Sequence, residues 1–118
     1  MLKFEDKLQK HFKSKLKPIV FCNGELSLFN LIQAWKYYLG ANKCSAIVPS
    51  FTFSGTVNAL AQNNIKPIFC DINQTLTLDL KKIKLQKDTK FIVAASVYGN
   101  IPNLNYIKKF AKKNNIIF

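Results

Sequence analysis

The stretch Ile47-Val48-Pro49-Ser50-Phe51-Thr52-Phe53-Ser54-Gly55-Thr56 decides the fold of this 118-residue chain. Residues 46–48 are apolar and suit a buried strand, which is expected to end at Pro49 because proline cannot donate to a sheet ladder. A loop with hydroxyl groups and phenyl rings follows, and Gly55 permits close backbone approach beside the start of a helix over residues 56–62. Ligands of open α/β sheets bind at the carboxyl ends of the strands, so this loop is predicted to hold a planar, polar ligand.

Apolar runs and helical stripes alternate on both sides of this stretch. The short apolar runs predict strands over residues 18–22, 46–48, 66–72 and 90–97, with a further strand beginning at 116–118. Helical periodicity and capping residues predict helices over residues 4–16, 25–39, 56–62, 80–85 and 104–113. The alternation predicts an α/β fold with three layers, in which helices cover both faces of a mostly parallel sheet and the crossovers are right-handed.

One domain is expected over residues 1–118, with an amphipathic leader helix at 1–16 and alternating strand and helix units at 17–118. The helix at 25–39 is apolar around most of its circumference and is therefore expected to be buried on more than one side. No apolar run approaches the roughly 20 residues that span a bilayer. The first ten residues are too charged for a signal peptide, so a soluble, cytoplasmic protein without a membrane partner is expected.

The formal net charge is +12, and all eighteen basic residues are lysine. Arginine is the residue that reads bases and clamps phosphates through paired hydrogen bonds, so nucleic acid is not expected as a partner. Cys22, Cys44 and Cys70 form no C-x-x-C pair and His11 is the single histidine, so no metal site is expected. Cys22 and Cys70 end apolar runs and are expected to be buried, reduced thiols, whereas His11 is expected at the surface.

Several short motifs follow one another in a specific order along the chain. They are Phe4-Glu5, Asn23-Gly24-Glu25, Val48-Pro49-Ser50-Phe51-Thr52-Phe53, Pro67-Ile68-Phe69-Cys70-Asp71-Ile72 with Thr75, Leu78-Asp79, and Tyr98-Gly99. In this order and spacing they resemble the N-terminal third of the DegT/DnrJ/StrS family of sugar aminotransferases, which are fold-type I enzymes dependent on pyridoxal 5′-phosphate (PLP). The resemblance implies that the chain is the incomplete N-terminal part of a fold-type I PLP-transferase large domain.

The resemblance also implies three cofactor-binding residues, Gly24, Glu25 and Phe53. Phe53 would stack on the pyridine ring of PLP, although its position also fits a residue of the hydrophobic core. Gly24 and the amides that follow would face the phosphate at the start of a helix, although Gly24 also fits an ordinary turn. Glu25 stands where the family usually has a small hydroxyl residue, and its carboxylate would repel a phosphate unless the side chain turns outward.

The activity implied by the resemblance is transfer of an amino group from an amino acid such as glutamate to a nucleotide-linked keto-sugar, by a homodimer. The family's Schiff-base lysine, and the aspartate that pairs with the pyridine nitrogen, would lie beyond Phe118. The chain is therefore expected to be a fragment that is inactive alone and binds PLP weakly or not at all. A sugar 3-dehydratase of the same group is an alternative.

Two non-enzymatic alternatives are a non-catalytic truncated remnant and a basic anion-binding α/β module, and Glu25 favours both. A nucleotide-binding Rossmann domain is disfavoured because no G-x-G-x-x-G follows the first predicted strand. Asp71, Ser96 and Tyr98 lie at predicted strand ends, where they would either line a sugar pocket or serve as caps and loop hydrogen-bonding residues.

Overall fold

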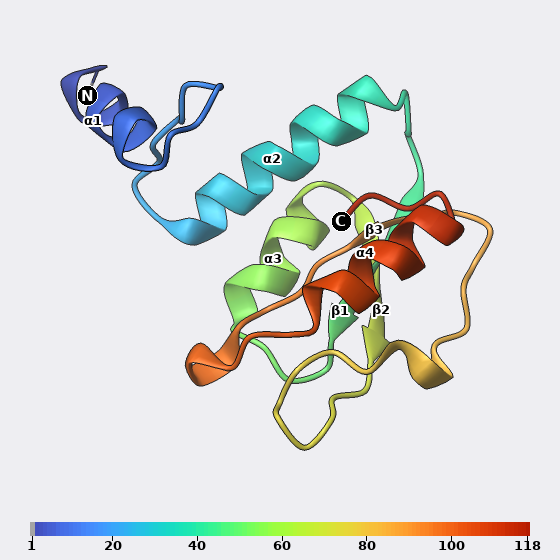
Figure 1. The fold of residues 1–118 in the computed structure, drawn as a ribbon. Coiled ribbons are helices and arrows are strands. Elements are labelled where there is room, and N and C mark those ends of the chain that lie inside the picture. The colour runs from blue at the N-terminus through green and yellow to red at the C-terminus, as the bar shows by residue number, and fades with distance from the viewer. Residues whose placement is uncertain (1) are drawn as a thin grey trace.

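A parallel sheet lies at the centre of the computed structural model, which describes residues 2–118 (Figure 1). Its strands are β1 (Cys44–Pro49), β2 (Ile65–Cys70) and β3 (Thr89–Ile92), in the order β2-β1-β3, and β1 pairs in parallel with both neighbours. Ile117 forms a parallel bridge with Phe91, so the predicted last strand begins on the far side of β3. The mostly parallel sheet expected from the sequence is confirmed.

Helices cover both faces of this sheet. The helices α2 (Gly24–Tyr38) and α3 (Ser54–Gln62) contribute to one hydrophobic core, which contains Ile32, Cys44, Ala46, Val48, Ala59, Leu60, Ile65 and Phe91. The helix α4 (Leu104–Lys113) and the short 3-10 helix η1 (Leu80–Lys82) contribute to the other, which contains Ile47, Cys70, Leu78, Leu80, Ile92, Ile107, Ala111 and Ile116. All six residues of β1 are buried because it has strands on both sides and helices on both faces. The three-layer α/β fold is confirmed.

Side-chain caps fix where α2, α4 and η1 begin. Asn23 Oδ1 accepts from the Leu26 amide at 2.8 Å at the start of α2, and Asn103 Oδ1 accepts from the Tyr106 amide at 3.0 Å at the start of α4. Asp79 Oδ1 accepts from the Lys81 amide at 3.1 Å and caps η1. Gly40 follows α2 with a φ of 60°, a left-handed conformation that glycine adopts without strain.

The helices α2 and α3 run in the same direction and are joined by polar contacts near the end of α3 (Figure 1). Lys36 Nζ donates to the Asn63 carbonyl at 2.6 Å, which places a cation at the negative end of α3. The buried Asn63 amide donates to the Phe29 carbonyl of α2 at 3.1 Å and to the Ala59 carbonyl of α3 at 2.9 Å. Because α3 begins just after β1 ends, both helices begin near the carboxyl end of the sheet.

The predicted strand at 18–22 is wrong. Residues 18–22 form no strand, Ile19 is 76% exposed, and the Val20 amide donates to Glu5 Oε1 at 3.2 Å instead of to a sheet. This segment connects α1 (Leu2–His11) to α2 and lies away from the strands (Figure 1), so it has no partner for a ladder. Cys22 is consequently exposed, and its predicted burial is also wrong.

The other two thiols are buried. Burial raises the pKa of Cys70 to about 11, and burial likewise raises the pKa of Cys44. These directions keep both groups in the neutral thiol form at neutral pH and agree with the predicted inert Cys70. His11 is exposed, as expected.

Several predicted elements differ in length from the observed ones. The first helix ends at His11 and not at residue 16, because Lys13 turns into a left-handed conformation with a φ of 48°. The strand expected at 90–97 ends at Ile92, and after one more ladder bond from the Val93 amide to the Ile47 carbonyl at 2.8 Å the chain leaves the sheet. The helix expected at 80–85 is the three-residue η1, and α3 begins two residues before residue 56.

The second helix, α2, was expected to be buried on more than one side. Within the described residues 2–118, this expectation is wrong. Ile32 packs into the core, but Leu31, Trp35 and Tyr38 of α2 are exposed. Among the residues that the structure describes, no helix has the length and apolar character needed to cross a membrane.

Replacing Asn63 with alanine should lower the free energy of unfolding by about 1–3 kcal/mol, because the change removes the two hydrogen bonds that its side chain donates to the Phe29 and Ala59 carbonyls. Urea unfolding followed by circular dichroism measures the difference. Asn58→Ala is the matched control, because Asn58 is an exposed residue of the same helix, and its unfolding free energy should stay within about 0.5 kcal/mol of the wild type. Equal values for the two variants would contradict the role given to Asn63.

Candidate functional site

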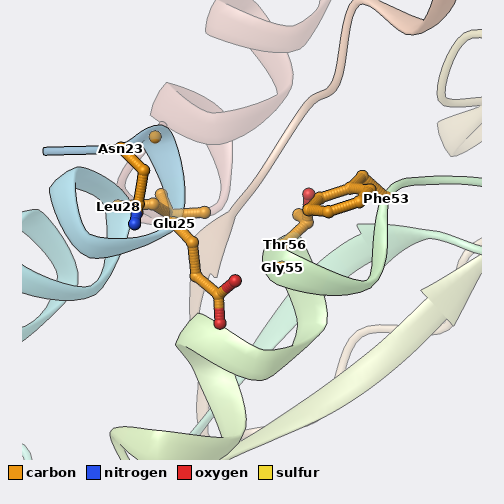
Figure 2. Close-up of a pocket in the computed structure, with 7 residues that line it drawn as sticks. Asn23, Glu25, Leu28, Phe53, Gly55 and Thr56 are labelled. Atoms are coloured by element: carbon orange, nitrogen blue, oxygen red, sulfur yellow. The ribbon is translucent and has the colours of Figure 1, made fainter.

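A cavity of about 480 Å³ lies between the starts of α2 and α3 (Figure 2). Its lining residues are Asn23, Gly24, Glu25, Leu28, Phe53, Gly55 and Thr56. The structure therefore brings the three predicted site residues, Gly24, Glu25 and Phe53, to one cavity although 28 positions separate Glu25 from Phe53 in the sequence. Asn23 and Leu28 were not predicted to line it. An asparagine directly before a helix is a common N-cap signal, and it would have indicated the position of Asn23.

Two helix starts give this cavity its electrostatic character. The first residues of α2 and of α3 carry backbone N–H groups without helical partners, and the positive end of each helix dipole lies there. In α2, the Asn23 side chain satisfies the Leu26 amide. In α3, Phe53 occupies the N-cap position and offers no side-chain acceptor. Helix starts of this kind attract anions such as phosphate.

Gly55 lies close to the side chains of Glu25 and Phe53. A Cβ added there would lie 2.8 Å from Glu25 Oε2 and 2.9 Å from Phe53 Cε1, which is closer than real contacts allow. The Phe53 ring and the Glu25 carboxylate therefore both rest on the space that a side chain at position 55 would fill. Thr52 Oγ1 donates to Thr56 Oγ1 at 3.1 Å and connects the loop to the first turn of the same helix.

Phe53 is 75% exposed, so its alternative assignment as a core residue is wrong. It lies four residues after Pro49, and Figure 2 shows its ring at the start of α3, across the cavity from Glu25. An exposed phenyl face beside a cavity is suited to stacking against a flat ring of a ligand.

Glu25 gives the cavity a negative charge. Its side chain extends from α2 toward α3 (Figure 2), and its carboxylate approaches the first turn of α3 at Gly55. None of the seven lining residues is a lysine, so no cation from the lining offsets this charge. The carboxylate suits the positive start of α3, and it would repel a phosphate placed in the same cavity.

A second cavity of about 430 Å³ lies beside Phe53. Its lining residues are Phe51, Thr52, Phe53, Thr56, Ala95, Ser96, Val97 and Tyr98. Ser96 and Tyr98 therefore lie together at a cavity. Of their two predicted roles, lining a pocket required this position. Asp71 does not line it, and Asp71 Oδ1 instead accepts from the Ile72 amide at 2.9 Å, which is the predicted loop role.

The family model of the DegT/DnrJ/EryC1/StrS aminotransferase family matches residues 1–118. The chain belongs to this family. The resemblance inferred from the ordered motifs is thus confirmed over the whole chain, including the V-P-S-F-T-F segment at residues 48–53.

The names of two curated relatives describe enzymes that act on sugars. The 3-oxo-glucose-6-phosphate:glutamate aminotransferase of Bacillus subtilis is 36% identical over 70 residues, which are 57% of this chain and 16% of the relative. The GDP-perosamine synthase of Vibrio cholerae is 26% identical over 121 residues, which are 97% of this chain and 32% of the relative. The chain thus spans about a third or less of the length of these relatives.

A solved GDP-4-keto-6-deoxymannose-3-dehydratase, trapped with PLP and glutamate, superimposes with a TM-score of 0.84 at 26% identity. The match covers 99% of this chain and 32% of the dehydratase. This likeness confirms the fold-type I architecture, and the expected cofactor, PLP, is present in that relative. Aminotransferases and a dehydratase are both among the similar proteins, as the sequence had left open.

Two glycines at helix starts make a matched pair for testing the packing at the cavity. Gly24→Ala should raise the free energy of unfolding by about 0.5–1 kcal/mol, because no atom lies within 4 Å of the added Cβ and alanine favours helix. Gly55→Ala should give no such gain, because its Cβ must displace the Phe53 ring and the Glu25 carboxylate. Urea unfolding of the two variants measures the difference, and an equal gain in both would refute the close packing at Gly55.

Proposed function

We propose that this chain forms the cofactor-binding part of a PLP-dependent enzyme that transfers an amino group from an amino acid such as glutamate to a nucleotide-linked keto-sugar. The observation that carries the proposal is the exposed Phe53 ring, which shares a cavity of about 480 Å³ with the start of α2. Family membership and the PLP-containing solved relative support it.

Three features of the cavity fit PLP. The amides of Gly24 and Glu25 at the start of α2 would hold the phosphate, since they have no helical partners and lie at the positive end of the helix dipole. The Phe53 ring would stack on the pyridine ring. Gly55, which lacks a Cβ, lets the Phe53 ring lie against the start of α3. The Glu25 carboxylate is the one group that does not fit, and it must turn away from Gly55 when a phosphate enters.

Bound PLP supplies an electron sink that makes the α-proton of an amino acid removable. In this proposal, residues 2–118 bind and orient the cofactor, while the Schiff-base lysine and the aspartate at the pyridine nitrogen come from elsewhere in the protein. The lysines of this chain are poor candidates for the first role, because a catalytic lysine needs a partly desolvated site. We propose that the protein acts as a homodimer in the cytoplasm and that the chain alone is inactive.

A non-catalytic anion-binding module is the second candidate function. The two helix starts at the cavity favour it, whereas the Glu25 carboxylate opposes it. The two functions differ in what the cavity should bind. The cofactor function requires both a flat ring and a phosphate, whereas an anion module requires only the phosphate.

Titration of the chain with pyridoxamine 5′-phosphate tests the cofactor function. This probe carries an amine in place of the PLP aldehyde, so it cannot form imines with the eighteen lysines of the chain. Phe53→Ala should weaken binding by about tenfold, because it removes the stacking surface. Phe51→Ala is the matched control, because Phe51 does not line this cavity, and its affinity should equal that of the wild type. An unchanged affinity of Phe53→Ala would remove Phe53 from the site.

The charge of Glu25 can be tested in the same titration. Glu25→Gln keeps the shape of the side chain and should tighten binding of pyridoxamine 5′-phosphate by about fivefold, which corresponds to roughly 1 kcal/mol between like charges a few ångströms apart in a wet cavity. Pyridoxamine, which lacks the phosphate, should bind both proteins equally. If Glu25→Gln left the phosphorylated probe unaffected, the phosphate would lie elsewhere.

A further inference from the structure

The N-terminal segment over residues 2–22 lies apart from both hydrophobic cores. None of its described residues belongs to either core, and Figure 1 shows α1 at one end of the molecule, away from the sheet. We propose that this segment docks on the surface of a membrane that contains anionic lipids, with α1 lying in the plane of the headgroups. The residues that line the cofactor cavity take no part in this surface.

Hydrogen bonds and an ion pair hold the segment as one folded-back unit. α1 ends where the Ser14 amide donates to the Gln9 carbonyl at 3.0 Å, a bond typical of a helix C-terminus. The chain then returns alongside α1, and Lys17 Nζ lies 2.8 Å from Asp6 Oδ1. These contacts give the segment a defined surface although it lies outside the cores.

The two carboxylates of this segment contact its own returning chain. Asp6 pairs with Lys17, and Glu5 Oε1 accepts from the Val20 amide at 3.2 Å. The segment has six lysines, and within residues 2–118 the five others form no ion pair. These five lysines are all exposed, and they are Lys3, Lys7, Lys10, Lys13 and Lys15. The segment therefore presents unpaired positive charge, which attracts an anionic lipid surface.

Apolar side chains lie beside these lysines on α1. Phe4, Leu8 and Phe12 recur every four residues, and the Phe12 amide donates to the Leu8 carbonyl at 3.0 Å, so the three occupy one side of the helix. Phe4 is 53% exposed and Phe12 is 71% exposed. Lys3 and Lys7 each precede one of these residues and lie on the adjoining side. Exposed phenyl rings flanked by lysines are typical of helices that lie in the membrane interface.

The helix α4 shows that lysines alone do not make such a surface. It also carries exposed lysines, Lys108 and Lys112 among them, but its apolar side packs into a core through Ile107, Phe110 and Ala111. In α1 the corresponding side has no core to pack against. Burial of the Phe4 and Phe12 rings among lipid acyl chains would remove their apolar surface from water, while the lysine stems extend toward the headgroups.

This docking differs from the crossing of a bilayer. The sequence predicted no membrane partner because no apolar run is long enough to span one. A helix in the interface needs no such run, because its backbone hydrogen bonds are made within the helix and only one side enters the lipid.

Co-sedimentation of the 118-residue chain with lipid vesicles tests the apolar part of this surface. The chain should bind vesicles of mixed phosphatidylglycerol and phosphatidylcholine at low salt, and it should not bind vesicles of phosphatidylcholine alone. Phe12→Ala should weaken binding about tenfold, because it removes a phenyl ring from the lipid. Phe69→Ala is the matched control, because Phe69 is 57% exposed on β2, and its binding should equal that of the wild type. Circular dichroism checks that both variants are folded.

The charged part of the surface is tested in the same assay. Lys3→Gln combined with Lys7→Gln should weaken binding to the anionic vesicles by at least about tenfold, because each lysine near such a surface adds to the affinity. Lys108→Gln combined with Lys112→Gln removes the same charge at the same spacing on α4, and it should weaken binding by about threefold or less.

The proposal is overturned if the wild type does not bind the anionic vesicles, or if Phe12→Ala binds them as well as the wild type does. An equal loss in the two lysine double variants also overturns it, because binding would then depend on the overall charge and not on α1. Sedimentation velocity detects the competing occupant, a second copy of the chain. A wild-type dimer that Phe12→Ala dissociates, without any vesicle binding, would assign this side of α1 to that copy.

Discussion

The close contact at Gly55 is the constraint on which the candidate site depends. Because Gly55 has no Cβ, the Phe53 ring and the Glu25 carboxylate both approach the first turn of α3. Near the other end of α3, Lys36 and Asn63 connect it to α2 through hydrogen bonds. Contacts at both ends keep the two helices running in the same direction, and so bring two positive helix ends to one cavity at the carboxyl end of the sheet.

Much of this arrangement could be predicted from the sequence because it is set by local chemistry. Pro49 ends a fully buried strand, Asn103 and Asp79 cap the helices that follow them, and Gly40 takes the left-handed conformation after α2. The presence of Phe53 and Gly24 at one cavity was predictable only through the resemblance to a known family. No periodicity in the chain relates two residues that meet through the packing of α2 on α3.

The wrong predictions share a different cause, namely that they concern contacts between distant segments. Residues 18–22 have the apolar composition of a strand, but no neighbouring strand pairs with them. The apolar run after Ile92 leaves the sheet once the Val93 amide has paired with the Ile47 carbonyl. The left-handed backbone conformation of Tyr98 could not be predicted from the sequence, because a tyrosine before a glycine is compatible with many turns. Tertiary context overrides local propensity in each case.

The position of Phe53 between two cavities has a thermodynamic consequence. A molecule in either cavity restricts the motion of the same exposed ring, so an occupant of one side lowers the ordering entropy that an occupant of the other side must overcome. Such linkage is reciprocal: whatever factor the first occupant contributes to the affinity of the second, the second contributes to the first. Cooperativity between two small molecules would thus arise from one shared aromatic side chain, without any movement of the sheet.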